Sequence, residues 1–155
     1  MERRKERSVA DTDEATVLIS GAADGLGRRV ARDLGASGTT VLLHGRDKER
    51  AETTAREIRK ETNNDKLRYY LADFSSLDGV RRLAEEVRAD HDHLDVLVNN
   101  AGVFARERVV SGDGHELTFA VNYLGYFLLA TLLTDLLVSS APARVVSVAG
   151  GGHRS

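Results

Sequence analysis

Hydrophobic residues along this chain follow two alternating patterns: short runs rich in β-branched residues, and longer stretches with apolar residues three or four apart. The first run, Thr16–Ser20, leads straight into a glycine cluster without polar alternation, which is typical of a strand buried on both faces. The next stretch, Leu26–Leu34, has helical spacing and is followed by Gly35 and Gly38. In chain order the predicted strands are residues 16–20, 39–44, 66–71, 94–98 and 144–148.

Two further helices are expected to begin at residues that cap the free N–H groups of a first turn. Asp47 precedes a polar stretch that keeps its few apolar residues on one face. Ser75 or Ser76 precedes a stretch with leucine and valine three or four apart. These patterns predict helices at residues 47–63 and from residue 75 or 76 to about residue 87, and a longer helix at residues 115–140.

The alternation of strands and helices predicts the fold class. Strands separated by helical segments form βαβ units, hence an α/β fold with a parallel sheet and helices on both faces. Right-handed crossovers make the sheet doubly wound, and five strands take the order 3-2-1-4-5. A ligand is expected where the strand order reverses, between strands 1 and 4. We interpret residues 1–14 as a flexible charged leader and residues 15–155 as one Rossmann-like domain, truncated after its fifth strand.

Composition narrows the classes of function. The chain has 155 residues, of which 41% are hydrophobic and 30% charged, as expected for one globular domain. A formal net charge of -2 offers no basic surface for nucleic acid. No apolar run reaches the ~20 residues of a membrane span. The absence of cysteine excludes disulfides and fits a cytoplasmic protein, and no metal site is predicted because the adjacent side chains of His91-Asp92-His93 diverge in a surface turn.

The residues after the first strand carry a chemical signal. Gly21, Gly25 and Gly27 follow the pattern G-x-x-x-G-x-G where a strand turns into a helix. Glycines there permit a tight turn, close approach of the backbone to a pyrophosphate, and close packing of helix on strand. The helix N-terminus adds N–H groups and a positive dipole end, so we predict a dinucleotide site that includes Asp24 and Leu26. A purely structural turn is the alternative, and the charge of Asp24 weakens phosphate binding unless its side chain points away.

Positions at the ends of the other strands agree with a dinucleotide. Arg46 follows the second strand, where an adenosine ribose would lie, and a cation there favours the 2′-phosphate of NADP over the free hydroxyl of NAD. A solvated loop arginine is the alternative. Asp73 ends the third strand and either accepts the adenine amino group or caps the next helix. Asn100, Ala101 and Gly102 follow the fourth strand, where small residues let the backbone run close to a ligand.

Taken together, these motifs resemble the short-chain dehydrogenase/reductase family from about Ala15 to Val148. The loop Ser20–Gly27 is similar to the family pattern T-G-x-x-x-G-[I/L]-G, with serine in place of threonine, and residues 100–102 lie in its N-N-A-G motif. The resemblance extends to Asp73 and Phe74 in the adenine-contacting D-[L/F]-S-S-L segment, to Asn122 in the helix that carries the active-site asparagine, and to His44-Gly45-Arg46-Asp47, which is similar to the NADP-leaning branch near retinol dehydrogenases and protochlorophyllide reductases.

The chain also departs from the family pattern. Gly150 occupies the position of the catalytic serine, and Ser147, three residues upstream within the strand, cannot replace it. No Y-x-x-x-K motif occurs. The resemblance implies that tyrosine is the acid/base, lysine lowers its pKa and holds the ribose, serine orients the substrate oxygen, and asparagine holds a water on the proton relay. Of these four only Asn122 is present, so the chain alone is expected to be inactive.

Three functional hypotheses remain open. The first is the N-terminal portion of an NAD(P)(H)-dependent oxidoreductase that transfers hydride between nicotinamide and an alcohol or carbonyl substrate, with NADP preferred over NAD. The second is a non-catalytic NADP(H)-binding or sensing module, which Gly150 favours because truncation alone does not remove a serine. The third is a structural relic that binds nothing. An exposed edge at residues 144–148 and a broad apolar face on the 115–140 helix predict a homo-oligomer.

Overall fold

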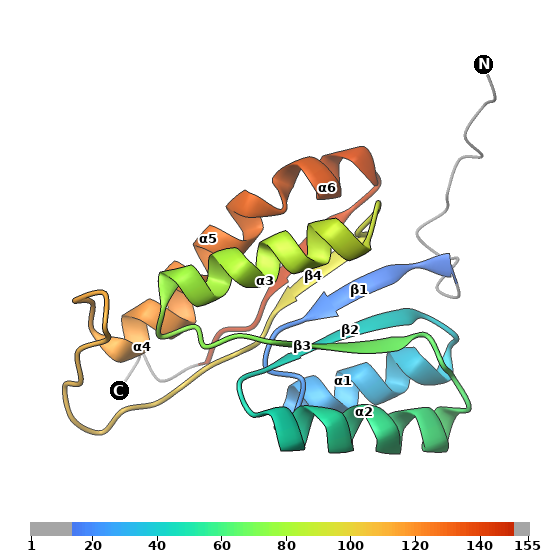
Figure 1. Ribbon diagram of the computed structural model, residues 1–155, viewed down its shortest axis with the longest axis horizontal. Helices are drawn as coiled ribbons and strands as arrows, with labels where there is room; N and C mark the ends of the chain where they lie inside the picture. Colours follow the sequence, from blue (N-terminus) through green and yellow to red (C-terminus); the bar gives the residue numbers. More distant parts are fainter. Residues whose placement is uncertain (1–13, 151–155) are drawn as a thin grey trace.

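A parallel sheet runs through the protein, whose computed structural model describes residues 14–150 (Figure 1). Its five strands lie in the order β3-β2-β1-β4-β5. They are β1 (Thr16–Ile19), β2 (Thr40–Gly45), β3 (Leu67–Leu71), β4 (Val96–Asn99) and β5 (Arg144–Ser147). All four neighbouring pairs are parallel, so the doubly wound α/β fold and the strand order are confirmed. Residues 1–13 of the predicted leader lie outside the described residues, and that interpretation stays a prediction.

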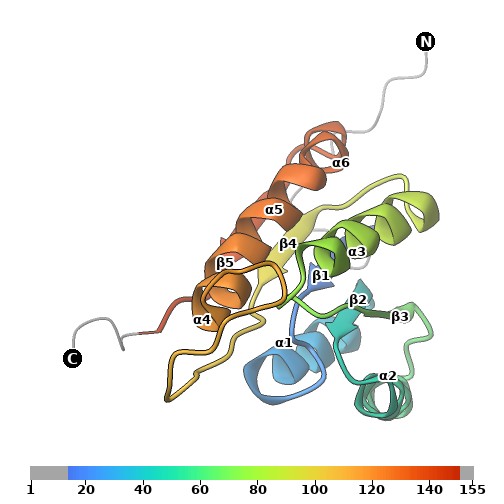
Figure 2. The ribbon, with the colours of Figure 1, turned by 60° about the vertical axis from the view of Figure 1, so that its left-hand side comes forward.

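Helices cover both faces of the sheet (Figures 1 and 2). One face carries α1 (Gly25–Ala36) and α2 (Lys48–Thr62), and the other carries α3 (Leu77–Asp90), α5 (Gly125–Leu132) and α6 (Thr134–Ser139). The expected caps form. The Asp47 carboxylate accepts the Arg50 N–H at 2.8 Å at the start of α2, and the Ser76 hydroxyl accepts the Gly79 N–H at 3.3 Å at the start of α3. Ser76 is therefore the cap of α3.

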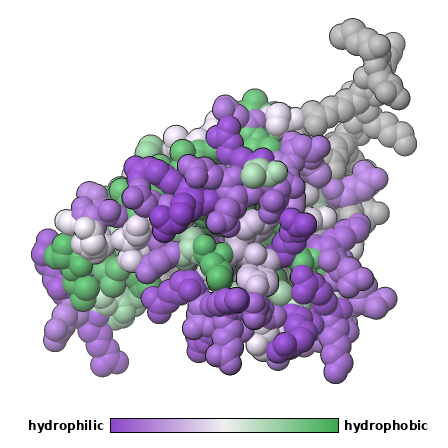
Figure 3. Space-filling view, viewed as in Figure 1, coloured by the Kyte–Doolittle hydropathy of each residue, from purple (hydrophilic) through white to green (hydrophobic). Residues whose placement is uncertain are grey.

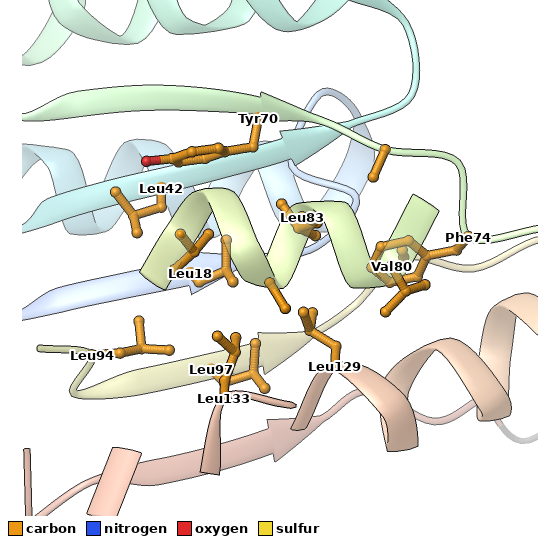
Figure 4. Close-up of a cluster of buried hydrophobic side chains, with 14 of the residues drawn as sticks. Leu18, Leu42, Tyr70, Phe74, Val80, Leu83, Leu94, Leu97, Leu129 and Leu133 are labelled. Carbon is orange, nitrogen blue, oxygen red and sulfur yellow. The ribbon is translucent and has the colours of Figure 1, made fainter. Parts of the chain in front are cut away.

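The side chains of each strand alternate between two hydrophobic cores. Val17 and Ile19 of β1 belong to the core beneath α1 and α2, whereas Leu18 between them belongs to the core beneath α3 and α5. Figure 4 shows the second core, where Leu83 and Leu129 from the two helices meet Leu18 on the sheet. The strand is buried on both faces, which explains why its sequence has no polar alternation.

The single helix expected at residues 115–140 is wrong in detail. The segment contains α4 (Leu117–Phe119), a π-helical turn η2 (Ala120–Leu124), then α5 and α6. The Glu116 carboxylate caps the start by accepting the N–H groups of Thr118 and Phe119. Threonine hydroxyls in α5 and α6 bond carbonyls four residues back, which competes with the helical ladder near the break at Leu133. Apolar spacing near 3.6 residues is too coarse to reveal one widened turn or a one-residue break between two helices.

β5 forms one edge of the sheet, as expected. It pairs with β4 through the register Val98↔Val146, and all four of its residues are exposed. The opposite edge is β3, in which Leu67 and Tyr70 are buried and Arg68 and Leu71 are exposed. The carboxyl ends of β1 and β4 therefore lie side by side in the middle of the sheet, where the strand order reverses.

Candidate functional site

The turn from β1 into α1 leaves no room for a side chain at two of its glycines. Gly21 has a φ of 66°, and a Cβ there would lie 2.7 Å from the Ala101 Cα. A Cβ at Gly27 would lie 2.3 Å from the Gly21 carbonyl oxygen and 2.5 Å from the Asn100 side-chain nitrogen. Gly25 differs, because a Cβ there would meet nothing within 4 Å. Gly21 and Gly27 thus permit close packing, while Gly25 leaves space in front of the helix.

Ser20 and Asn100 join the ends of β1 and β4. The Ser20 hydroxyl accepts the N–H groups of Asn100 at 2.9 Å and Ala101 at 3.0 Å. In return the Asn100 side-chain NH₂ donates to the carbonyl oxygens of Ser20 and Gly21, at 3.0 and 3.1 Å. Ser20 therefore does structural work that the sequence pattern alone did not assign to it. The four bonds hold the glycine turn against the N-N-A-G segment.

His44, near the end of β2, belongs to the His44-Gly45-Arg46-Asp47 motif, but the sequence assigned no role to its side chain. Its ring is buried and stacks on Phe74, with centroids 4.4 Å apart. Nδ1 accepts the Gly21 N–H at 3.2 Å, so the proton lies on Nε2, which donates to the Ala72 carbonyl at 2.9 Å. Burial lowers the pKa of His44 to about 4, so the ring is neutral at pH 7. A histidine that ends an otherwise apolar strand was the available signal.

A cavity of about 720 Å³ opens at this edge of the sheet. Its wall brings together residues from the ends of β1, β2, β3 and β4, as expected at a topological switch point. Of the residues expected from the sequence, Gly21, Asp24, Gly25, Leu26, Arg46, Asp73, Phe74, Asn100, Ala101 and Gly102 line it. Gly27 packs behind the wall, and neither Asn122 nor Gly150 is part of the lining.

Asp24 and Arg46 lie at the charged side of this cavity. The Asp24 carboxylate turns toward the start of α1, where its Oδ1 accepts the Gly25 N–H at 2.7 Å. Its Oδ2 lies 3.7 Å from the Arg50 guanidinium. Arg46 is exposed and has no ion pair within residues 14–150. The charge of Asp24 was expected to weaken phosphate binding unless its side chain points away. In the structure the side chain lies at the N-terminus of α1 and does not point away.

Asp73 combines two possible tasks. Its Oδ1 accepts the Ser75 N–H at 2.9 Å, a local turn contact ahead of α3, whereas the cap of that helix is Ser76 and not Asp73. It also lines the cavity. Just behind it, a Cβ at Gly79 would lie 2.5 Å from the Asp73 carbonyl oxygen, so α3 packs closely against this corner. The local contact is observed, and an adenine contact stays a prediction.

Asn122 lies in η2 and binds the backbone of Val103. Its Oδ1 accepts the Val103 N–H and its Nδ2 donates to the Val103 carbonyl, both at 2.9 Å. Next to it the Tyr126 hydroxyl donates to the Ala101 carbonyl at 2.5 Å. Both side chains therefore position the segment that follows β4. Gly150 lies beyond β5, and a Cβ there would meet nothing within 4 Å, so a serine would fit.

A family model agrees with this geometry. The model of the short chain dehydrogenases matches residues 15–153, nearly the whole sequence. The chain belongs to the short chain dehydrogenase family. This confirms the resemblance drawn from the glycine turn and the N-N-A-G segment. Within the family pattern, Ser20 takes the place of a threonine, and its hydroxyl makes the strand-joining bonds described above.

Individual relatives are similar over most of this chain. Mouse retinol dehydrogenase 13 is 41% identical over 138 residues, which cover 89% of this chain and 41% of the relative. A metagenomic short-chain oxidoreductase solved in complex with NADP is 28% identical, with a TM-score of 0.76 over 88% of this chain and 64% of that chain. A short chain dehydrogenase from Escherichia coli CFT073 complexed with NADPH is 26% identical, with a TM-score of 0.78 over 92% and 61% of the two chains.

This short chain dehydrogenase sequence spans about two-fifths of the length of the retinol dehydrogenase that it matches. In the part that the structure describes, no helix is long and apolar enough to cross a membrane. Nor do residues 14–150 contain a group of three histidine, aspartate or glutamate side chains that could hold a metal ion. His91 contacts the Tyr70 hydroxyl at 2.9 Å, whereas His93 contacts Thr16 and Asp92, so the two rings serve different neighbours.

Proposed function

We propose that this chain is the nucleotide-binding portion of an NADP(H)-dependent oxidoreductase acting on an alcohol or carbonyl substrate. The observation that carries the proposal is the cavity at the carboxyl ends of β1 and β4, where the glycine turn and Arg46 meet. Doubly wound sheets bind their ligands at this place. Two structural neighbours were solved with NADP or NADPH, which supports the same cofactor class here.

The cavity residues suit the parts of such a cofactor. Space in front of Gly25 and the N-terminus of α1 suit the pyrophosphate, because backbone N–H groups there attract anions. The exposed guanidinium of Arg46 suits a phosphate on the adenosine ribose. Asp73 can offer Oδ2 to the adenine amino group, since its Oδ1 already accepts the Ser75 N–H. NADP, when bound, supplies the hydride acceptor or donor, and these residues bind and orient it.

In this proposal Asn122 acts by holding the backbone of Val103 in place. Its two bonds to Val103 hold the segment that follows β4, which forms the cavity wall on the side away from Arg46. Its side-chain amide groups are already engaged by Val103. We therefore assign it as a positioning residue of the cofactor and substrate site.

Cofactor titration tests the proposal. NADPH and NADH binding are measured by calorimetry or fluorescence for the wild type, for Arg46→Asp, and for Arg29→Asp, an exposed arginine on α1 outside the cavity wall. We expect NADPH to bind more tightly than NADH. Because a charged hydrogen bond contributes about 1.5–3 kcal/mol, Arg46→Asp should reduce that preference by about tenfold or more.

The control sharpens the result. Arg29→Asp makes the same charge change elsewhere and should leave the NADPH/NADH ratio within about twofold of the wild type. An unchanged ratio in Arg46→Asp would reduce Arg46 to a solvated loop residue. If neither cofactor binds the wild type, the nucleotide-binding proposal is wrong.

A non-catalytic NADP(H)-binding or sensing module is the second candidate, and Gly150 at the serine position favours it. The two candidates differ in turnover. We expect this chain alone to show no oxidation or reduction of secondary alcohols, quinones or retinoids, the last included because relatives are named retinol dehydrogenases. Nicotinamide absorbance provides the assay. Turnover by the wild type that disappears in Asn122→Ala would exclude the non-catalytic reading.

Three expectations about substrate, assembly and location accompany this proposal. A small-molecule substrate agrees with the family, while homo-oligomerisation and a cytoplasmic location stay predictions.

A further inference from the structure

Two arginines border the adenosine side of the cavity, and they differ in their partners. Arg46 follows β2, and Arg50 lies in the first turn of α2; both line the cavity. The Arg50 Nη1 atom lies 3.7 Å from Asp24 Oδ2, whereas Arg46 makes no ion pair within the described range 14–150. The sequence patterns pointed to Arg46 alone, because Arg50 looks like an ordinary charged position of a polar helix.

Asp24 links the starts of two helices. One carboxylate oxygen accepts the Gly25 N–H at 2.7 Å at the N-terminus of α1, and the other faces Arg50 on α2. The N-terminus of a helix attracts anions, so a carboxylate there occupies a place that also suits a phosphate. The protein therefore carries an anion of its own at the mouth of the proposed phosphate site.

The ion pair between Arg50 and Asp24 is weak enough for Arg50 to exchange its partner. The side chains of Arg50 and Asp24 are 69% and 80% exposed, and an exposed pair is weak because water screens it. Their separation of 3.7 Å exceeds hydrogen-bond length. A phosphate monoester carries nearly two negative charges and three acceptor oxygens, and a guanidinium binds two such oxygens at once. Phosphate is thus the stronger partner for Arg50.

We infer that Arg50 is a specificity-determining residue that exchanges Asp24 for a phosphate monoester on the adenosine ribose, with Asp24 as its resident competitor. The inference rests on the proposed function and extends it. Asp24 then weakens nucleotide binding in two separable ways. Its charge repels every phosphate in the cavity, and its pairing with Arg50 penalises the ribose phosphate in particular.

A double-mutant cycle with two small probes separates these effects. The probes are adenosine 2′,5′-bisphosphate and adenosine 5′-monophosphate, which differ by the ribose phosphate and avoid the nicotinamide half. The variants are Asp24→Asn, Arg50→Gln and the double variant. Asp24→Asn keeps an oxygen that can accept the Gly25 N–H, so α1 retains its cap. Calorimetry at low ionic strength measures each affinity, and a series at higher salt follows the electrostatic part.

The expected results have opposite signs. Arg50→Gln should weaken the bisphosphate by about tenfold and the monophosphate by less than about twofold, as expected for loss of a charged hydrogen bond to one group. Asp24→Asn should tighten the bisphosphate by about threefold to tenfold and the monophosphate by less. In the Arg50→Gln background, Asp24→Asn should help both probes equally, because the competition for Arg50 is gone.

Arg56→Gln is the matched control. Arg56 lies on the exposed side of the same helix, donates to the Thr53 hydroxyl at 3.3 Å and does not line the cavity. If Arg50→Gln changes the probe ratio no more than Arg56→Gln does, the inference is wrong while nucleotide binding stands. Weaker bisphosphate binding by Asp24→Asn would likewise overturn it and make Asp24 a structural cap. Failure of both probes to bind the wild type would remove the proposed function together with the inference.

Discussion

β2 and β5 have opposite surroundings in the sheet. Both are parallel strands with adjacent apolar residues, yet Val41 and Leu42 of β2 are fully buried while Val145 and Val146 of β5 are 49% and 46% exposed. β2 lies between two strands with helices over both faces, whereas β5 pairs with β4 alone. The middle of the sheet is thus covered on both faces, by segments from the whole described chain, whereas the β5 side leaves apolar side chains exposed.

The helices α2 and α5 also differ in how polar their exposed surfaces are. The outward face of α2 is densely charged, while α5 contains no charged residue and exposes Phe127 by 64%. Near its start, Phe119 and Tyr123 stack with centroids 5.2 Å apart on the exposed side. Figure 3 shows apolar side chains gathered at the left-hand end of the view, around α4, and a mainly polar surface over α2 and α3. A charged helix face is favourable in water, whereas an exposed uncharged face is typical of a surface that contacts another protein.

Truncating one side chain in each strand measures the contrast directly. Leu42→Ala removes a fully buried side chain and should lower the free energy of unfolding by about 2–5 kcal/mol. Val146→Ala removes a half-exposed one and should change it by less than about 0.5 kcal/mol. Urea denaturation followed by circular dichroism gives both values. Equal losses would mean that β5 is covered in solution.

Acid should lower the free energy of unfolding through the buried ring of His44. His44 has a folded-state pKa of about 4 against 6.5 when unfolded, so protons favour the unfolded chain. Its contribution is complete above pH 6.5 and is lost as the pH falls toward 4, by up to about 3 kcal/mol. His44→Leu should flatten this part of the stability profile while keeping His91, whose pKa burial also lowers. An unchanged slope in His44→Leu would assign the acid sensitivity to other groups.

A charge on the uncovered side should affect association and leave folding nearly unchanged. We expect the wild type to self-associate at high micromolar concentration through its exposed apolar surface. Phe127→Lys should weaken that association by about tenfold, since a desolvated lysine opposes an apolar contact. Ala89→Lys, at an exposed position of α3, is the control. Light scattering across a concentration series decides the matter, and a wild type that stays monomeric throughout would contradict the expectation.

Local signals predicted much of this protein correctly. Asp47 and Ser76 cap helices as their positions indicated, because capping involves residues only a few places apart. The glycine turn was predictable for the same reason. The π-helical turn at Asn122 was not, because one widened turn hardly alters the spacing of apolar residues. The Asp24–Arg50 pair was also missed, since it joins the starts of two different helices.

The sequence by itself determined the strands, their order and the glycines of the turn, because these follow from hydrophobic periodicity, chain handedness and backbone sterics. Tertiary structure decided what surrounds each polar group. His44 is neutral because burial lowers its pKa, and its two ring nitrogens bridge Gly21 and Ala72, which lie 23 and 28 positions away in the chain. Val41 and Val146 look alike in sequence, but burial depends on which distant segments cover a side chain, and that is determined only when the sheet and helices pack together.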